Sequence, residues 1–519
     1  MLIPLLRRLG GPLGRLIDRW DWLSRLASRV AIDAIVGSTR NRPHPLSTFG
    51  DYVSWPGLTD RSYLARHLPP KAAPDAPAVA EVAALFRRPP GGGVASAKST
   101  CLFPAFAQYL TDGFLRTDME RRDRNTSNHE IDLCPLYGRT EAQTRVLRLL
   151  SEAEGERGLM RTQRIDGEDW SPWLHRKGTR ELAEPAFAEL DPPLGIGADT
   201  PQELVDVVFA VGGDRVNTSP HVVMMNTLFL REHNRLARLI AADNPGWSDE
   251  RVFQTARNTM IAIFIKLVVE DYIRHIAPLP FRLRADPSAA WGARWNRPNW
   301  MTVEFSLLYR WHPLLPDAVD WPAPEGKRRI PLHAFLRRND LLPEAGLMAA
   351  FAATAGQPAN AVGAFNTADA LHPFEERAIA QARFNRLPGY NAYRRAFGMK
   401  ERHHIEEISS DPQVVKLLKS LYRTVEDVEF YPGIFAEDRV ADSPLPELLM
   451  RMVAVDAFSQ ALTNPLLSEH VWNPATFTER GWAEIAATAT VADVLRRNVP
   501  APTDAPIAMT LPGWRPGAG

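Results

Sequence analysis

SPHVVMMNTLFLREHNRLARLIAADN, residues 219–244, is the stretch that sets the fold class most plainly. It opens with Ser219, a residue type that caps helices, and Pro220, which suits the first helical position. Apolar side chains then recur at helical spacing, at positions 222, 225, 229, 236 and 239. A second pattern of the same kind follows in WSDERVFQTARNTMIAIFIKLVVEDYI (247–273), with Ser248 as its cap. The two patterns predict a buried pair of long helices that sandwiches a further group.

The rest of the chain is also mainly helical in pattern. Strand-like alternation is short and scarce, and a strand is expected near FRLRAD (281–286). With 519 residues, 45% hydrophobic and 24% charged, the chain is long enough for three domains, although one large helical domain fits as well. We therefore predict a mostly α protein with an N-terminal segment (1–50), a large helical domain (51–498) and a proline-rich tail (499–519).

Charge and cysteine content exclude several classes of protein. The chain has 61 Lys and Arg residues and 61 Asp and Glu residues, so no net field attracts nucleic acid, and none is expected as a partner. Cys101 and Cys134 are the two cysteines, which cannot build a disulfide framework and therefore favour a reducing compartment. The sequence contains no CxxC, zinc-ligand, P-loop or strand-linked GxGxxG pattern.

The first 29 residues, MLIPLLRRLGGPLGRLIDRWDWLSRLASR, form a basic amphipathic pattern. A helical stripe of apolar residues is interleaved with arginines: Leu5, Leu9, Leu13, Leu16, Trp20, Leu23 and Ala27, with Arg7, Arg8, Arg15, Arg19 and Arg25. The arginines interrupt every apolar stretch, which argues against a signal peptide or a membrane span. Such a helix suits the plane of an anionic membrane surface, and the alternative is a stripe packed on the domain. Gly10, Gly11 and Pro12 are expected to break it into two pieces.

A tyrosine and a histidine lie three residues apart in VEFSLLYRWHPLLPD (303–317). The pattern predicts one amphipathic helix whose last turn ends at Pro313, because proline clashes with the preceding turn. On such a helix Tyr309 and His312 present their rings to the same space. These residues alone leave two interpretations open. Both are core residues with satisfied polar ends, or the imidazole faces a metal or a proton.

A second polar pair lies in the apolar stretch CLFPAFAQYLTDGFLRTD (101–118). Gln108 and Asp112 are four residues apart, so both face one side of the predicted helix. Buried polar groups are costly unless they are paired. The two residues therefore form either a structural hydrogen bond or part of a pocket.

Eight segments, in order along the chain, resemble the cyclooxygenase and plant fatty-acid α-dioxygenase branch of the animal-type haem peroxidase superfamily. They are DYVSWPGLTDRSYLARHLPP (51–70), FAQYLTDGF (106–114), NTSNHEIDLCPLYGRTEAQTRVLR (125–148), LFLREHNRLARL (228–239), VEFSLLYRWHPLLPD (303–317), PGYNAYRRAFG (388–398), ELLMRMV (447–453) and VWNPATFTERG (471–481). The resemblance implies a mostly helical haem domain. The EGF-like module of animal cyclooxygenases is absent, as the two cysteines require.

The resemblance also implies roles for single residues. In the family's YxWHP segment the histidine is the proximal haem-iron ligand and the tyrosine carries the radical that starts dioxygenation, which implies these roles for His312 and Tyr309 and haem b as the cofactor. On the family's distal helix a glutamine is followed, four residues later, by a histidine. Gln108 matches the glutamine, but Asp112 stands at the histidine position. A carboxyl group normally titrates near about pH 4 and replaces an imidazole poorly, so dioxygenation is expected more than peroxidase activity.

The residues that hold the substrate acid in the family are matched only in part. Tyr272 matches an earlier pocket tyrosine, whereas Leu279 stands where the anchoring tyrosine is expected. Ser459 falls near the cyclooxygenase channel serine. Arg29 and Arg40 are the candidates for the anchoring arginine.

The resemblance implies an enzyme that adds O₂ to an unsaturated long-chain fatty acid through a tyrosyl radical and yields a fatty-acid hydroperoxide. Two alternatives remain: a haem peroxidase that oxidises small organic substrates with hydrogen peroxide, and a haem-binding protein without catalysis. We expect the protein in the cytoplasm, on the inner face of the membrane through its N-terminal helices. The oligomeric state is left open, with a homodimer as one option.

Overall fold

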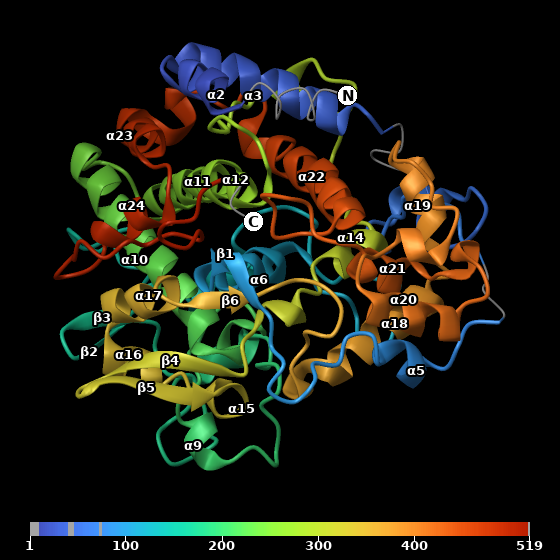
Figure 1. Cartoon of the computed structure of the whole chain (residues 1–519). Coiled ribbons are helices and arrows are strands. Elements are labelled where there is room, and N and C mark those ends of the chain that lie inside the picture. Colours follow the sequence, from blue (N-terminus) through green and yellow to red (C-terminus); the bar gives the residue numbers. More distant parts are fainter. Residues whose placement is uncertain (1–9, 40–45, 72–74, 517–519) are drawn as a thin grey trace.

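The computed structural model describes residues 10–39, 46–71 and 75–516 of the chain, with side chains from residue 13 on. Helices packed around one extended hydrophobic core make up most of the ordered structure (Figure 1), which confirms the predicted mostly α fold. Arg40, Leu5 and Leu9 lie outside the described residues.

The two long predicted helices form the centre of the fold. They are α10 (Pro220–Asp243) and α11 (Asp249–Leu267). The second continues through the π-helical segment η3 (Val268–Ile273) into α12 (Arg274–Ile276). The hydroxyl of Ser248 accepts a hydrogen bond from the backbone N–H of Arg251, which confirms the predicted cap. Among the described residues, one helical stretch, 249–276, is long and apolar enough to cross a membrane by composition. However, 78% of its apolar window is buried inside the protein, as expected of a core helix.

Other helices enclose this central pair and position the segments described below. α6 (Leu102–Phe114) packs on α10, and α23 (Pro474–Ala487) packs on α11. α14 (Val303–Leu308) packs between α18 (His372–Phe384) and α22 (Glu447–Leu462). The remaining helices are α4 (Trp55–Thr59), α5 (Val79–Ala83), α7 (Cys134–Tyr137), α8 (Glu141–Val146), η1 (Pro185–Glu189), α9 (Gln202–Val205), η2 (Val216–Thr218), α13 (Ser288–Trp291), η4 (His312–Leu314), α15 (Leu332–Phe335), α16 (Leu341–Ala345), α17 (Leu347–Ala355), η5 (Asp369–Leu371), α19 (Tyr390–Ala396), η6 (Ile405–Glu407), α20 (Pro412–Leu421), η7 (Val425–Asp427), α21 (Phe430–Ala436), η8 (Pro465–Leu467) and α24 (Val491–Arg496).

Strands among the described residues are short and pair in three antiparallel ribbons, none of which the sequence patterns predicted. The strands are β1 (Ala95–Thr100) with β6 (Pro358–Asn360), β2 (Gln163–Ile165) with β3 (Glu168–Trp170), and β4 (Ala318–Ala323) with β5 (Gly326–Pro331). The C-terminal segment extends the first ribbon, because the N–H of Thr100 donates to Met509 and the N–H of Leu511 donates to Lys98. Cys101 is buried beside this ribbon as a free thiol.

The prediction of a strand at 281–286 is wrong. This segment is extended, but its backbone bonds to side chains of the N-terminal helices instead of another strand. Ser24 donates to the carbonyl of Arg282, and Ser28 accepts from the N–H of Arg284. The apolar residues of the alternating pattern point into the core while the arginines stay outside, which explains the alternation without a sheet.

The N-terminal segment forms two helices that lie across the top of the molecule in Figure 1. They are α2 (Gly10–Asp18) and α3 (Asp21–Val36), and α3 packs on α22 and α13. The break predicted at residues 10–12 stays a prediction, because α2 begins at Gly10 and the residues before it lie outside the described part of the chain, and a further interruption falls at Arg19 and Trp20. Pro12 lies in the first turn of α2, where a missing N–H costs nothing.

Candidate functional site

The segment with Tyr309 and His312 departs from the helix that its sequence predicts. α14 ends at Leu308, and Tyr309 and Trp311 adopt non-helical backbone angles (φ −99°, ψ 24° and φ −90°, ψ 40°) before the 3₁₀ turn η4 starts at His312. The ring of Trp311, beyond the end of α14, takes part in the aromatic stacking described below. Tyr309 and His312 therefore do not share a helix face, and each has its own surroundings.

His312 is held by a buried carboxylate. Its Nδ1 lies 3.0 Å from Oε1 of Glu375, a fully buried residue of α18. Glu375 also accepts hydrogen bonds from the hydroxyls of Thr367 (2.8 Å) and Tyr431 (2.5 Å). Metal-binding histidines commonly donate the second ring nitrogen to a carboxylate in this way, which fixes the tautomer and the ring orientation. Among the described residues the ring makes no other hydrogen bond, so Nε2 is left for an iron ion.

Sequence reasoning missed Glu375, although it is the closest partner of the His312 ring. It lies 63 residues further along the chain, in the first turns of α18, and no local pattern links the two positions. Tyr431, in the recognisable run EFYPG, was missed for the same reason.

Tyr309 lies among aromatic rings. Its ring stacks on Trp311 with centroids 4.7 Å apart and an interplanar angle of 25°, and it tilts against Phe305 at 4.7 Å. Trp311 in turn stacks on Phe103 of α6 at 5.4 Å and on Tyr272 of η3 at 6.4 Å. These rings come from segments that are far apart in sequence, and they surround Tyr309 with apolar surface.

The hydroxyl of Tyr309 has no ordinary hydrogen bond among the described residues. Tyr272, the pocket tyrosine of the family pattern, is close enough for the two hydroxyls to affect each other's pKa, but neither makes a bond of good geometry. Burial raises the pKa of Tyr309 above its usual value, partly offset by Tyr272 and reinforced by Asp456. The phenol therefore keeps its proton at any physiological pH.

Gln108 and Asp112 lie one turn apart on α6, and one short segment meets both. Nε2 of Gln108 donates to Oγ1 of Thr218 at 3.0 Å, and Nη1 of Arg215 lies 3.8 Å from Oδ1 of Asp112. The two α6 side chains do not bond each other, and Oδ2 of Asp112 has no hydrogen-bond partner among the described residues. The sequence left two interpretations of this pair open, a structural hydrogen bond or part of a pocket. The hydrogen bond between Gln108 and Asp112 is not formed.

The protonation of Asp112 is sensitive near neutral pH. Burial raises the pKa of Asp112 to about 7, because the guanidinium groups of Arg215 and Arg139 offset only part of the cost of burying its charge, and Asp214 adds to that cost. Asp112 thus differs from an ordinary surface carboxylate: it can hold a proton and release it near pH 7.

The His312 side and the α6 side face a common interior region. The charge of Arg310 interacts with Glu375 on one side and with Asp112 on the other. Gln108, Arg310 and His312 each keep partial exposure among largely buried neighbours, and the His312 side and the α6 side are called the two walls of the candidate site below. An imidazole held by a carboxylate on one wall, and an amide and an unpaired carboxyl oxygen on the other, fit the haem that the sequence resemblance implies.

The remaining predicted site residues lie at different depths. Ser459 is buried on α22, but its hydroxyl bonds to the carbonyls of Val455 and Asp456 of its own helix. Leu279 is partly buried against the core. Arg29 lies exposed on α3, away from Tyr309's aromatic surroundings.

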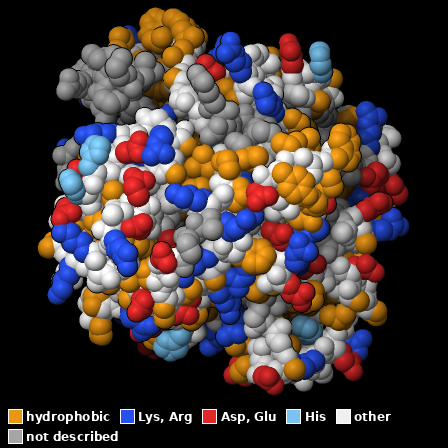
Figure 2. Space-filling view, turned by 90° about the vertical axis from the view of Figure 1, so that its right-hand side faces the viewer, with side chains coloured by type: hydrophobic (Ala, Val, Ile, Leu, Met, Phe, Trp, Pro, Cys, Tyr) orange, Lys and Arg blue, Asp and Glu red, His pale blue; other side chains and the backbone are white. Residues whose placement is uncertain are grey.

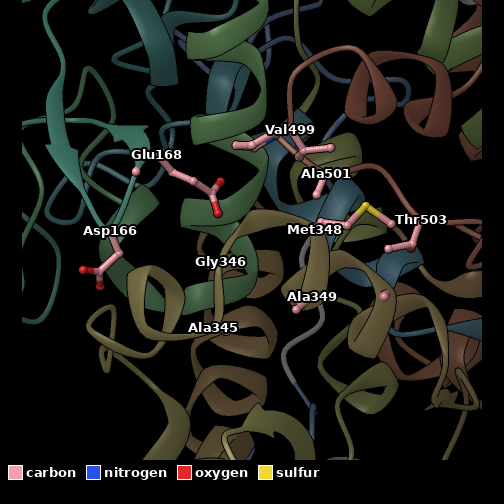
Figure 3. A pocket seen from close by; sticks show the side chains of 12 residues that line it. Asp166, Glu168, Ala345, Gly346, Met348, Ala349, Val499, Ala501 and Thr503 are labelled. Atoms are coloured by element: carbon pink, nitrogen blue, oxygen red, sulfur yellow. The ribbon is translucent and has the colours of Figure 1, made fainter.

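A separate surface pocket of about 600 Å³ lies between the β2–β3 turn, the start of α17 and the C-terminal segment (Figure 3). Its polar lining includes Asp166, Glu168 and Thr503, and Met348 and Val499 contribute apolar surface. It shares no lining residue with the site around Tyr309 and His312.

Comparison with known proteins places the chain in a family. The family model for animal haem peroxidases matches residues 94–509. Prostaglandin G/H synthase 2 of Bos taurus is 30% identical over 467 residues, which cover 86% of this chain and 72% of that protein. Prostaglandin G/H synthase 1 of Rattus norvegicus is 28% identical over 484 residues, with 88% and 75% covered.

Solved structures show the same fold. Peroxidase A from Dictyostelium discoideum superposes with a TM-score of 0.69 at 19% identity, covering 89% of this chain and 99% of that one. The fatty acid alpha-dioxygenase of Oryza sativa gives 0.68 at 16% identity, with 84% and 81% covered. Since the family model spans most of the chain, including both walls of the site, the chain belongs to the animal haem peroxidase family of oxidoreductases.

Proposed function

We propose that the protein is a haem b-dependent dioxygenase that adds O₂ to an unsaturated long-chain fatty acid and forms a fatty-acid hydroperoxide. The observation that carries this proposal is the environment of Tyr309. Its phenol makes no hydrogen bond of good geometry among the described residues, packs against aromatic rings, and lies three residues before a histidine whose ring a carboxylate holds. The prostaglandin synthase relatives and the fold shared with fatty acid alpha-dioxygenases support the substrate class. One structure of the rice protein holds palmitic acid.

The roles follow from the contacts. His312 would hold the haem iron, while Glu375 fixes the orientation of its ring. Haem, when bound, supplies one-electron oxidation chemistry next to the aromatic rings. Tyr309 would lose one electron to a haem that a hydroperoxide has oxidised and its phenolic proton to solvent, and the resulting phenoxyl oxygen takes a hydrogen atom from a substrate C–H bond. O₂ adds to the carbon radical, and the peroxyl radical recovers a hydrogen atom from Tyr309 to give the hydroperoxide.

The surroundings of Tyr309 suit a radical for two reasons. The rings of Phe305 and Trp311 exclude water, which would otherwise quench or divert it. The polar neighbour of the hydroxyl among the described residues is the Tyr272 hydroxyl, and the two make no hydrogen bond of good geometry.

A haem peroxidase is the second candidate, and Asp112 favours it. A carboxyl group with a pKa of about 7 can accept a proton from hydrogen peroxide and return it, as the distal histidine does in the family pattern. Its ion pair with Arg215 at 3.8 Å opposes that role, because the guanidinium stabilises the carboxylate and lowers its affinity for a proton.

We also propose that α2 and α3 attach the protein to the inner face of the cytoplasmic membrane. Exposed apolar side chains gather on these helices: Leu16, Trp20, Trp22, Leu26 and Val30, each 48–62% exposed. Figure 2 shows hydrophobic side chains on the surface at the top of the molecule, where these helices lie. Arg25 and Arg29 flank them and suit an anionic surface, and Arg29 remains the candidate to meet the acid head of a fatty acid that enters from the lipid.

An oxygen electrode with a panel of saturated and unsaturated fatty acids, followed by mass spectrometry of the products, tests the proposal. Oxygen uptake with linoleate and a hydroperoxide product supports the dioxygenase. Peroxide-dependent dye oxidation without oxygen uptake favours the peroxidase, and a haem spectrum with neither activity favours a binding protein. The same preparation, passed over a calibrated sizing column, tests whether it is a homodimer.

A further inference from the structure

We propose that Arg310 binds a propionate of the haem and thereby holds the porphyrin edge between the two walls of the site. The proposal rests on haem occupying this site, and it concerns a residue to which the sequence resemblance gives no role. Its basis is a deeply placed cation without an anionic partner.

Arg310 is poorly satisfied by the chain itself. The one hydrogen bond of its side chain among the described residues runs from Nη2 to Oε1 of Gln381 at 3.3 Å, and its Nε is buried with no partner. No carboxylate of the described residues forms an ion pair with it. By contrast, Arg394 is paired with Glu437 and Glu447. Because burying an unpaired charge is costly, this position calls for an anion.

The nearest carboxylates are committed elsewhere. Glu375 accepts from His312 and from two hydroxyls, as described above, and Asp112 faces Arg215. Gln381 is held in place as well, since its Nε2 donates to Oγ of Ser306 at 2.8 Å, and this bond turns its carbonyl oxygen towards Arg310. The guanidinium is thus oriented while its remaining donors stay available.

The position of Arg310 favours a haem carboxylate over a fatty-acid carboxylate. The charged groups that interact with the Arg310 guanidinium belong to the two walls. They are Glu375 on the His312 side, and Asp112 and Arg215 on the α6 side. Tyr309 instead interacts with Tyr272 and with Asp456. Tyr309 and Arg310 therefore have different polar neighbours, and Gln381, which bonds Arg310, shares α18 with Glu375, which bonds His312. This placement beside the imidazole favours a haem carboxylate as the partner of Arg310. An arginine binds such a group with two parallel charge-assisted bonds.

The test compares haemin with haemin dimethyl ester, in which both propionates are blocked. The full chain is loaded with each pigment, and its release to an excess of a haem-accepting protein is timed for wild type, Arg310→Met, Arg310→Lys and Arg66→Met. Arg66 is the matched control, because it is also buried with an unpaired Nε and bonds only to a carbonyl, that of Asn385. Circular dichroism and melting temperature check that each variant is folded.

We expect Arg310→Met to release haemin about 10–100 times faster than wild type, as for the loss of a charge-assisted hydrogen bond, and Arg310→Lys to fall between. The dimethyl ester should leave wild type and Arg310→Met at the same rate, and Arg66→Met should behave as wild type. Equal haemin release from wild type and Arg310→Met, or an equal acceleration for haemin and its ester, overturns the proposal.

Two further measurements separate this inference from its foundation. If wild type holds neither pigment, the haem assignment itself fails. If Arg310→Met loses binding of radiolabelled linoleate but keeps haemin as tightly as wild type, Arg310 binds the substrate carboxylate, and the propionate assignment is wrong.

Discussion

Asp112→Asn perturbs the α6 wall with almost no change of shape, and its effect on stability can be calculated. Burial raises the pKa of Asp112 from 3.8 to about 7, so the folded protein keeps a proton that the unfolded chain releases. The stability due to this proton is complete below pH 3.8 and is lost as the pH rises through 7. At about 1.36 kcal/mol per pKa unit the full loss is about 4 kcal/mol, of which about 2.6 kcal/mol falls between pH 5 and pH 8.

Asparagine carries no titrating proton, so the variant escapes this loss. Unfolding of wild type and variant at several pH values from 5 to 8 measures it, because other titrating groups cancel in the difference. Over this range the variant should gain about 2–3 kcal/mol relative to wild type, which for a chain of this length is about 2–3 °C in Tm. A difference that stays constant with pH, or that changes in the opposite direction, refutes the reasoning that Asp112 is buried with a raised pKa.

Three further variants test other parts of the account. His312→Ala should abolish or greatly weaken haem binding, and an unchanged Soret band would show that another residue ligates the iron. Glu375→Gln keeps an acceptor for the imidazole but removes its charge, so haem affinity should fall about 10–100-fold and the iron–imidazole stretching frequency should drop in resonance Raman spectra; an unaltered spectrum would mean that the carboxylate does not act on His312. Trp20→Ser with Trp22→Ser should weaken binding to anionic vesicles about tenfold or more in a flotation assay, whereas equal flotation of variant and wild type would place the membrane contact elsewhere.

Helical periodicity was sufficient to predict the fold class and the central helix pair. α10 and α11 follow the apolar spacing closely, and Ser248 caps α11 as its residue type suggests. The failures lie where side chains from distant segments decide the backbone. The alternating pattern of segment 281–286 predicts a strand because one side of the segment is buried. Its backbone hydrogen bonds nevertheless go to serines of α3.

The candidate site was predictable only where its chemistry is local in sequence. Gln108 and Asp112 share a helix, and their spacing of four residues predicts that both side chains lie on the same face of it. The sequence predicts one helix that joins Tyr309 and His312, but this helix ends at Leu308, and the Trp311 ring beyond it packs on Phe103 of α6. Long-range partners such as Glu375 leave no signal in a single sequence.

The central claim is that Tyr309 starts fatty-acid oxygenation in a haem-loaded enzyme, and one comparison tests it directly. Tyr309→Phe fills the same space among the rings of Phe305 and Trp311 but cannot be oxidised to a phenoxyl radical. Oxygen uptake with linoleate should be measured for wild type and variant at matched haem content, with the Soret band as the control for an intact site. The account predicts an unchanged Soret band and loss of oxygen uptake in the variant. Oxygen uptake by Tyr309→Phe at the wild-type rate would contradict it.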